Sequence, residues 1–160
     1  MFKILDPQCK PSKGSKYSAA IDLRSKEEMI IVPGDTILIP LGVKIDNKEM
    51  PIYLQNNLHR HYMQLMLRSS LSEELIIANG VGVIDLDYPG ELMLRVHNPI
   101  KKAELNETTN SISAYCKGID VEIKKGQRVA QVMILEHKSY LFGIETKSKR
   151  TGGFGSTGKQ

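Results

Sequence analysis

Large aromatic residues are scarce in this sequence, which has no tryptophan and only three phenylalanines among 160 residues. Proteins that bind single-stranded nucleic acid without sequence preference stack the bases on aromatic side chains, so we expect no platform of that kind and no direct nucleic-acid binding. The net charge of +4 is too small an excess to indicate nucleic acid by itself. That modest positive charge suits a small anionic ligand instead.

Cysteine is equally rare, since Cys9 and Cys116 are the only two in the chain. They form neither a CxxC motif nor a disulfide framework, so free thiols in a reducing compartment are the simplest interpretation. No apolar run approaches the roughly 20 residues of a membrane-spanning helix. Pro7 comes too early for a secretory signal. We therefore expect a cytoplasmic protein with no membrane partner.

The chain does contain many short runs of β-forming residues separated by turn residues. In the clearest run, Leu92, Leu94 and Val96 alternate with Glu91, Met93, Arg95 and His97. The other strands are expected at residues 2–5, 19–23, 29–32, 36–40, 42–45, 63–67, 121–123 and 128–135. No helix of three or more turns is predicted. The expected fold is therefore one all-β domain, a sandwich or barrel of short strands.

Two segments lack this β pattern. Residues 101–117 are polar and without a helical period, which predicts an inserted loop or hairpin within about 99–118. Residues 147–160 are rich in glycine and predict a flexible C-terminal arm after a β domain at 1–146. His59 and His61 could face the same way on a strand, but with no third ligand they would make a weak metal site. We interpret this pair as solvated surface.

The segment at residues 80–90 combines three glycines with two carboxylates and a tyrosine. Asp85 lies where a short apolar strand runs into a turn, and a carboxylate beside apolar surface can have its pKa tuned for general-base catalysis. The alternative is a hairpin whose aspartates only cap the turn. For Asp87, a structural salt bridge is the hypothesis.

Three further segments are more polar than a core requires. Arg68, followed by two serines, offers a guanidinium and hydroxyls for an oxyanion, although such triplets are also common in surface loops. Gln131 faces either a pocket or the solvent from its strand. In the tail, Phe154 stands among glycines, where a ligand ring to stack on would explain it better than a flexible terminus does.

Together, five segments at residues 19–23, 68–71, 79–90, 128–131 and 152–158 resemble the five ordered motifs of the trimeric dUTP diphosphatases, or dUTPases. The resemblance implies a jelly-roll-like (β-clip) subunit and a homotrimer with shared active sites. It also implies Mg²⁺-dependent hydrolysis of dUTP to dUMP and pyrophosphate, which keeps uracil out of DNA and supplies dUMP for dTTP synthesis.

The resemblance assigns the chemistry to the segment at 79–90. Asp85 is expected to deprotonate the water that attacks the α-phosphorus. Tyr88 is expected to pack against the deoxyribose and exclude a ribose 2′-hydroxyl. Asn79 and the backbone around Gly82 and Val83 are expected to read the uracil edge.

Other segments are assigned to the phosphates. Arg68, Ser69, Ser70 and Gln131 would bind them from other subunits' surfaces, with Asp22 in a supporting role. Mg²⁺ would be held by the phosphates and waters, without a direct protein ligand. The tail residues that would complete the site, with Phe154 over the uracil and the others at the phosphates, are Arg150, Phe154, Gly155, Ser156 and Thr157.

The chain departs from the family pattern in several places. Ala20 and Leu67 replace a glycine and a proline, and Lys149 competes with Arg150 for the tail's phosphate contact. The chain is also longer than a minimal member at about 47–62 and at 99–118, and the second stretch resembles extra segments of phage and viral dUTPases, which makes it a candidate site for a protein partner. The rival interpretations are dCTP deaminase, or a bifunctional deaminase-diphosphatase, whose chemistry uses an active-site glutamate, and a non-enzymatic jelly-roll interaction module.

Overall fold

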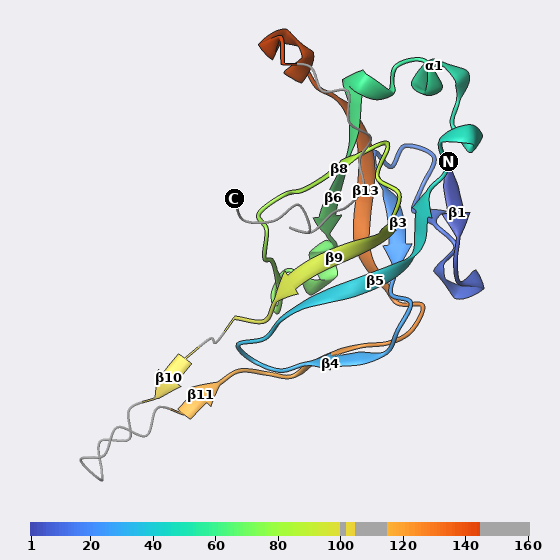
Figure 1. Ribbon diagram of the computed structural model, residues 1–160. Coiled ribbons are helices and arrows are strands. Elements are labelled where there is room, and N and C mark those ends of the chain that lie inside the picture. The colour runs from blue at the N-terminus through green and yellow to red at the C-terminus, as the bar shows by residue number, and fades with distance from the viewer. Residues whose placement is uncertain (100–101, 105–114, 145–160) are drawn as a thin grey trace.

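The computed structural model describes residues 1–99, 102–104 and 115–144, which form two main antiparallel sheets around one core (Figure 1). The five-stranded sheet has the order β2 (Ser12–Lys13), β3 (Ile21–Arg24), β13 (Arg128–Glu136), β6 (His61–Leu67) and β8 (Gly82–Asp85). The four-stranded sheet has the order β1 (Phe2–Ile4), β5 (Thr36–Ile45), β9 (Glu91–His97) and β7 (Ile76–Ile77). This architecture confirms the all-β prediction.

Two short ribbons complete the strands. β4 (Met29–Ile31) pairs with β12 (Val121–Ile123), and β10 (Lys102–Glu104) pairs with β11 (Tyr115–Lys117). The second pairing confirms that the polar segment at 101–117 begins and ends as a hairpin, while its status as an insertion stays a prediction. The predicted arm at 147–160 lies outside the described residues.

Helices are short in the described part of the chain. The only α-helix there is α1 (Ile52–Gln55), and the remaining helical turns are the 3₁₀ segments η1 (Pro7–Cys9), η2 (Asn47–Glu49), η3 (Leu58–Arg60), η4 (Ser69–Leu71) and η5 (Ser139–Phe142). The prediction that no long helix forms is therefore confirmed for these residues. None of these helices is long and apolar enough to cross a membrane.

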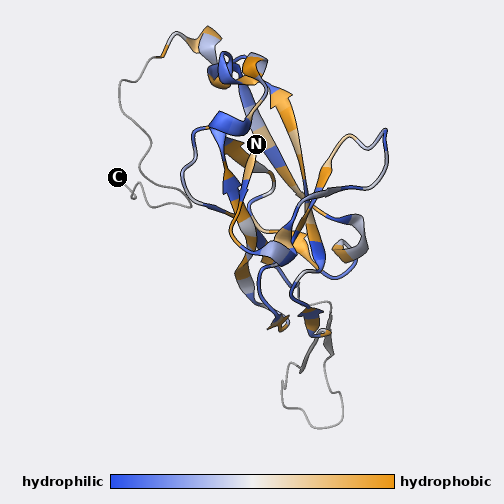
Figure 2. Ribbon diagram, turned by 90° about the vertical axis from the view of Figure 1, so that its right-hand side faces the viewer, coloured by the Kyte–Doolittle hydropathy of each residue, from blue (hydrophilic) through white to orange (hydrophobic). Residues whose placement is uncertain are grey.

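The core follows the alternation read from the sequence. Leu92, Leu94 and Val96 are all fully buried on one face of β9, because successive strand residues point to opposite faces of a sheet. Leu23 and Met63 of the other sheet are also fully buried and belong to the same cluster. Figure 2 shows the hydrophobic stretches running through the strands in the middle of the molecule.

β5 is longer than expected, because the two strands predicted at 36–40 and 42–45 are one. The pairing with β9 shifts its register between Pro40 and Lys44, and Gly42 has a positive φ of 62°. The break expected between the two strands is thus a bulge. A Cβ at Gly42 would lie 2.5 Å from the Cys9 Sγ. Burial there raises the pKa of the Cys9 thiol above its usual value.

The segment at 80–90 is not a hydrogen-bonded hairpin, so the alternative interpretation of it as a hairpin is not supported. β8 and β9 are consecutive in the chain, but β8 pairs with β6 in one sheet, whereas β9 pairs with β5 and β7 in the other. The two strands therefore separate at their connecting turn and enter different sheets. A sequence pattern of strand, turn and strand does not distinguish these two outcomes.

Candidate active site

Asp22 joins three of the predicted polar segments. Its carboxylate, on β3, is 3.3 Å from the Nε of Arg68 and 3.1 Å from an Nη of Arg128. Gln131 lies opposite Asp22 in the ladder between β13 and β3, so the two side chains share one face of the sheet. Asp22 is only 6% exposed. The structure thus brings together the segments at 19–23, 68–71 and 128–131.

The two serines after Arg68 extend this cluster toward the solvent. Ser69 and Ser70 lie in η4, and both are exposed. The Ser69 carbonyl accepts a hydrogen bond of 2.8 Å from the hydroxyl of Ser72, which holds the turn. The cationic and hydroxyl groups predicted to bind phosphate therefore lie at the C-terminal end of β6, where Leu67 is its last residue.

Asp85 lies at the opposite end of the same strand pair. It ends β8 across from Tyr62, and the Tyr88 N–H donates to its carbonyl at 3.0 Å to close the turn. Leu86 anchors that turn, since it is buried in the core. The Asp85 side chain is exposed.

Tyr88 depends on a glycine two residues later. A Cβ at Gly90 would overlap the phenol hydroxyl and ring of Tyr88, so a larger residue there would displace the ring. The ring also packs partly against the hydrophobic core. For Asp87, no ion pair with another described residue is found, so the hypothesis of a structural salt bridge is not supported.

Sequence reasoning missed the surroundings of Asp85. It shares a pocket of about 300 Å³ with three histidines, His59, His61 and His137, and with Asp87. His61 is buried and its Nδ1 is 2.9 Å from the Asn57 carbonyl oxygen, so its interpretation as solvated surface was wrong, whereas His59 is exposed. The register between β6 and β13, which brings His61 opposite Glu136, next to His137, has no signature in the sequence.

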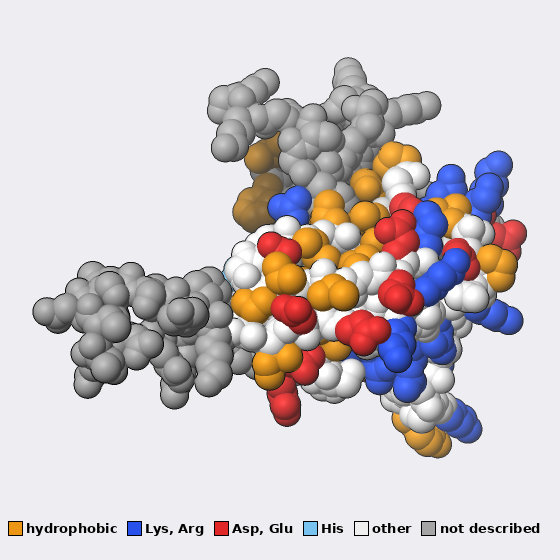
Figure 3. Space-filling model, turned by 90° about the horizontal axis from the view of Figure 1, so that it is seen from below, with side chains coloured by type: hydrophobic (Ala, Val, Ile, Leu, Met, Phe, Trp, Pro, Cys, Tyr) orange, Lys and Arg blue, Asp and Glu red, His pale blue; other side chains and the backbone are white. Residues whose placement is uncertain are grey.

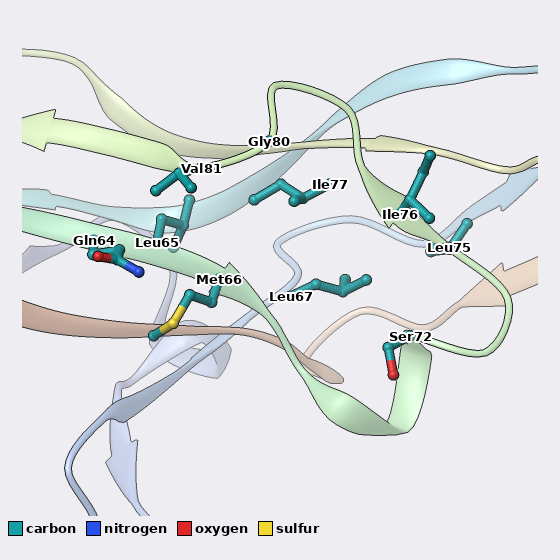
Figure 4. Close-up of a pocket in the computed structure, with 10 residues that line it drawn as sticks. All are labelled: Gln64, Leu65, Met66, Leu67, Ser72, Leu75, Ile76, Ile77, Gly80 and Val81. Carbon is teal, nitrogen blue, oxygen red and sulfur yellow. The ribbon is translucent and has the colours of Figure 1, made fainter.

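The predicted uracil-reading residues lie on the approach to β8. The Asn79 amide is 3.5 Å from the Val81 carbonyl, Gly80 has a φ of 71°, and Gly82 is buried against Leu65. Val83 is 60% exposed. Beside this loop lies a mainly apolar pocket of about 430 Å³, whose walls come from β6, from residues 72–77 including β7, and from Gly80 and Val81 (Figure 4).

The two halves of the predicted site are far apart within one chain. Asp85 pairs with Tyr62, and Arg68 follows six residues later along β6. At a rise of about 3.3 Å per residue the separation is about 20 Å. A triphosphate is much shorter than that, so one chain does not bring these two ends to the same phosphate.

The remaining predicted site residues are not described by the structure. These are Arg150, Phe154, Gly155, Ser156 and Thr157, together with Lys149. Among the residues at 1–99, 102–104 and 115–144, no group of three or more His, Cys, Asp or Glu side chains could hold a metal ion.

The sequence and the fold can be compared with known proteins. A family model described as dUTPase matches residues 7–109. Over 98% of its length, the chain is 32% identical to the deoxyuridine 5′-triphosphate nucleotidohydrolase of Hydrogenovibrio crunogenus, of which 95% is covered. The chain belongs to the dUTPase family. The corresponding protein of Methylobacillus flagellatus is also 32% identical, over 99% of this chain and 95% of its own.

Solved dUTPase structures share the fold. The enzyme from Streptococcus mutans superposes with a TM-score of 0.61 at 24% identity, over 84% of this chain and 94% of its own. A mutant of the Staphylococcus bacteriophage 80alpha dUTPase, solved with dUpNHpp, gives 0.63 at 22% identity over 100% and 94%. A mutant dUTPase of phage phi11, described with a structural Mg(II) ion, gives 0.61 at 20% identity over 97% of each chain.

Family membership confirms the predictions of a jelly-roll-like dUTPase fold and of a dUTP-hydrolysing enzyme. The rival interpretation as a non-enzymatic interaction module therefore falls away. The individual residue roles, the assembly and the metal are not decided by these comparisons.

Proposed function

We propose that this dUTPase hydrolyses dUTP to dUMP and pyrophosphate at sites shared between copies of the chain, with Asp85 as the base. The observation that supports sharing is the distance along β6 between Asp85 and Arg68. Hydrolysis of a phosphate needs a base for the water and donors for the phosphate oxygens. The Asp85 end bears the base, and the Arg68 end bears the donors. A second copy whose Arg68 end meets the Asp85 end of the first supplies the missing half, and the homotrimer expected from the family is the assembly we favour.

At the Asp85 end, the carboxylate binds a water and takes its proton as the oxygen attacks the α-phosphorus. Asp85 is exposed at a strand end, so it is accessible to substrate, and a positioned carboxylate within hydrogen-bond reach of the water suits general-base catalysis. The pocket is also lined by the carboxyl group of Asp87 and by the imidazoles of His59, His61 and His137. Their presence makes this end polar enough to hold an ordered water.

At the Arg68 end, the neighbouring copy binds the phosphates. Asp22 accepts a hydrogen bond from Arg128 and forms an ion pair with Arg68 at 3.3 Å, so it holds the two guanidinium groups side by side, while the terminal N–H groups of Arg68 are proposed to bind the phosphate oxygens. Gln131 and the hydroxyls of Ser69 and Ser70 add donors. Donors fixed before the reaction stabilise the charge that develops on the leaving pyrophosphate.

The residues proposed to select the base and the sugar lie on β8, on the loop before it and on the turn that leads to β9. The two strands belong to different sheets, so peptide groups near Gly82 and Val83 can pair with uracil, together with the Asn79 amide. The ring of Tyr88 lies against Gly90 and would pack on a deoxyribose while leaving no room for a 2′-hydroxyl.

Mg²⁺ fits this donor set as a companion of the substrate. The ion usually keeps several waters and binds phosphates with at most one or two carboxylates, so it needs no cage of protein ligands. When bound it neutralises charge on the phosphate oxygens. The tail, through Phe154, Gly155, Ser156, Thr157 and Arg150, is proposed to cover the bound nucleotide. A cytoplasmic location and a protein partner for residues 99–118 stay predictions.

Pyrophosphate release tests the function. The wild-type protein with Mg²⁺ is expected to hydrolyse dUTP and to leave dCTP, dTTP and UTP nearly untouched. Asp85→Asn should lower kcat by about 10²-fold to 10⁴-fold, because the amide cannot take a proton, while the Kd for a non-hydrolysable dUTP analogue stays within a few fold. Production of uracil nucleotides from dCTP would instead indicate the deaminase, and full activity of Asp85→Asn would remove Asp85 as the base.

A further inference from the structure

Tyr62 is the residue that strand pairing places beside Asp85. The two lie directly opposite each other in the antiparallel ladder between β6 and β8, in the upper part of Figure 1. The side chains of such a pair project from the same face of the sheet, with about 4.5–5.5 Å between their Cβ atoms. Tyr62 is half-buried, whereas the Asp85 side chain is exposed. The phenol ring is thus a neighbour that can limit the rotamers of the carboxylate.

The direction of the Tyr62 ring is set by Gln64. The Tyr62 hydroxyl donates a hydrogen bond to the Gln64 Oε1 at 3.3 Å. Residues two apart in a strand share a face of the sheet, and Gln64 itself lies opposite Val83. The hydrogen bond therefore runs along β6, beside the stretch of β8 that ends at Asp85.

The Tyr62 ring also has a fixed neighbour beyond β13. Its centre is 6.1 Å from the centre of the His137 ring, and the two planes are tilted by 54°. The His137 N–H donates to the Arg60 carbonyl at 2.8 Å, and its Nδ1 accepts from the Ser139 N–H at 3.3 Å. Because β6 lies between β8 and β13 in the sheet, Tyr62 lies between Asp85 and a histidine that is itself held in place.

Gln64 extends this arrangement to the uracil-reading loop. It lines the pocket of about 430 Å³ together with Gly80 and Val81 (Figure 4), whereas Asp85 lines the separate pocket of about 300 Å³. β8 runs from the first pocket to the second, and its ladder partners on β6 include both Gln64 and Tyr62. The hydrogen-bonded pair therefore lies alongside the strand that joins the uracil-reading loop to Asp85.

We propose that Tyr62 and Gln64 are positioning residues for dUTP hydrolysis. The phenol, oriented by the Gln64 amide, limits the Asp85 carboxylate to the rotamer that faces the attacking water. The inference rests on the proposed function, because the pair acts through Asp85. Each rotamer that turns the carboxylate away from the water lowers the fraction of productive complexes, and small misplacements of a catalytic group reduce the rate strongly. The pair therefore affects kcat rather than substrate binding.

Two substitutions break the hydrogen bond from either side. Tyr62→Phe keeps the ring and removes the donor, whereas Gln64→Leu removes the acceptor. Each should lower kcat for dUTP by about five- to tenfold, while KM and the Kd for a non-hydrolysable analogue stay within about twofold of wild type. Because the two side chains make one interaction, the double variant should be no slower than the slower single variant. Circular dichroism checks that all three variants fold.

The Asp85→Asn background separates a positioning role from a structural one. If Tyr62 acts only through the Asp85 carboxylate, adding Tyr62→Phe to Asp85→Asn should not lower the residual rate any further. A general loosening of the site would instead lower the rate in both backgrounds alike. Equal fold-changes in the two backgrounds would therefore overturn the inference, and so would a wild-type kcat in Tyr62→Phe.

Tyr17→Phe is the matched control, since it removes the same hydroxyl from a ring that is 87% exposed. A second control changes the residue opposite a carboxylate in another ladder. Ile30 lies opposite Glu122 between β4 and β12. β4 runs along the bottom of Figure 1, and Figure 3, which views that side, shows hydrophobic and acidic side chains intermixed. Tyr17→Phe and Ile30→Ala should both keep the wild-type kcat, and a loss in either that equals the loss in Tyr62→Phe would contradict a specific role for Tyr62.

The inference and the proposed function fail in different ways. An inactive Asp85→Asn together with a fully active Tyr62→Phe would leave the proposed function intact and remove Tyr62 from it. Full activity of Asp85→Asn would contradict both, because no carboxylate at that position would then need to be oriented.

Discussion

Asp22 places one buried carboxylate between two guanidinium groups that come from distant parts of the chain. Arg68 and Arg128 are 20% and 44% exposed in their side chains, whereas that of Asp22 is 8% exposed. The carboxylate therefore keeps two cations together that would otherwise repel each other. Its position supports the proposal that Asp22 acts on phosphate binding through the two guanidinium groups that it orients.

We expect Asp22→Asn to lose about 2–3 kcal/mol of unfolding free energy, less than a fully buried pair because Arg128 is half exposed. The KM for dUTP should also rise, since the guanidinium groups lose their shared anchor. Urea unfolding at fixed protein concentration measures the first effect and steady-state kinetics the second. Asp120→Asn, the same change at an exposed position, should alter neither. Equal losses in the two variants would contradict the anchoring role.

Gly90 leaves room for the Tyr88 ring, which is predicted to select deoxyribose over ribose. Because a Cβ there would overlap the Tyr88 ring, Gly90→Ala should displace the phenol and cost about 1–3 kcal/mol in stability. The preference for dUTP over UTP should narrow, with the ratio of kcat/KM values as the measurement. Gly14→Ala, in an exposed loop, serves as the comparison. An unchanged preference in Gly90→Ala would separate Tyr88 from sugar selection.

At the scale of single residues, the sequence contains motifs that assign candidate site residues, but no pattern that predicts what surrounds them. Asp85, Arg68 and Gln131 stand in motifs whose order along the chain is itself informative. His137 does not, because its nearness to Asp85 depends on the register of β13 on β6 and of β6 on β8. Register is decided by which faces are buried after folding, and no local pattern reports it.

Among the elements, the ribbon of β4 and β12 is tied to β9 by one side chain. Asn98 follows β9 and is 2% exposed. Its amide donates to the Ile31 carbonyl at 2.8 Å and to the Ile119 carbonyl at 3.0 Å. The two carbonyls belong to segments far from Asn98 in the chain, so this amide joins the end of β9 to β4 and to the residues before β12.

Asn98→Ala should therefore lose about 2–3 kcal/mol of unfolding free energy, because the buried Ile31 carbonyl and the partly buried Ile119 carbonyl lose their donor. The drop in Tm should be several degrees. Thr36→Val offers a matched test, since the Thr36 hydroxyl is exposed and makes one hydrogen bond of 3.0 Å, to His97. That variant should change stability by about 0.5 kcal/mol or less. A loss as large as that of Asn98→Ala would contradict the importance of burial.

Elements were predictable where one strand face is buried and the other is not, as in β9. The prediction divided β5 into two strands because Pro40 and Gly42 usually end a strand, whereas here they form a bulge. It joined β8 and β9 into a hairpin because a short turn links them. Their separation depends on which sheet each strand enters, and that is decided by contacts with β6 and β5.

For the whole molecule, the C-terminal tail is the part expected to affect turnover without affecting assembly. Removal of residues 150–160 should lower kcat/KM for dUTP by about 10²-fold or more, because donors to the phosphates and the cover over the base are lost. Mass and Tm should stay those of the full chain. Removal of residues 159–160 alone spares the motif and should leave the rate unchanged. A full rate after the longer deletion would exclude the tail from the site.

The separation of Asp85 from Arg68 along β6 also has a genetic consequence. In an assembly with shared sites, a chain with both Asp85→Asn and Arg68→Ala would disable two sites, the one to which it contributes residue 85 and the one to which it contributes residue 68. When such a chain is expressed in equal amount with the wild type, about a quarter of the sites stay intact if subunits mix at random, instead of about a half for self-contained sites. An allele of this kind would therefore be dominant, because the inactive chains also disable sites to which wild-type chains contribute.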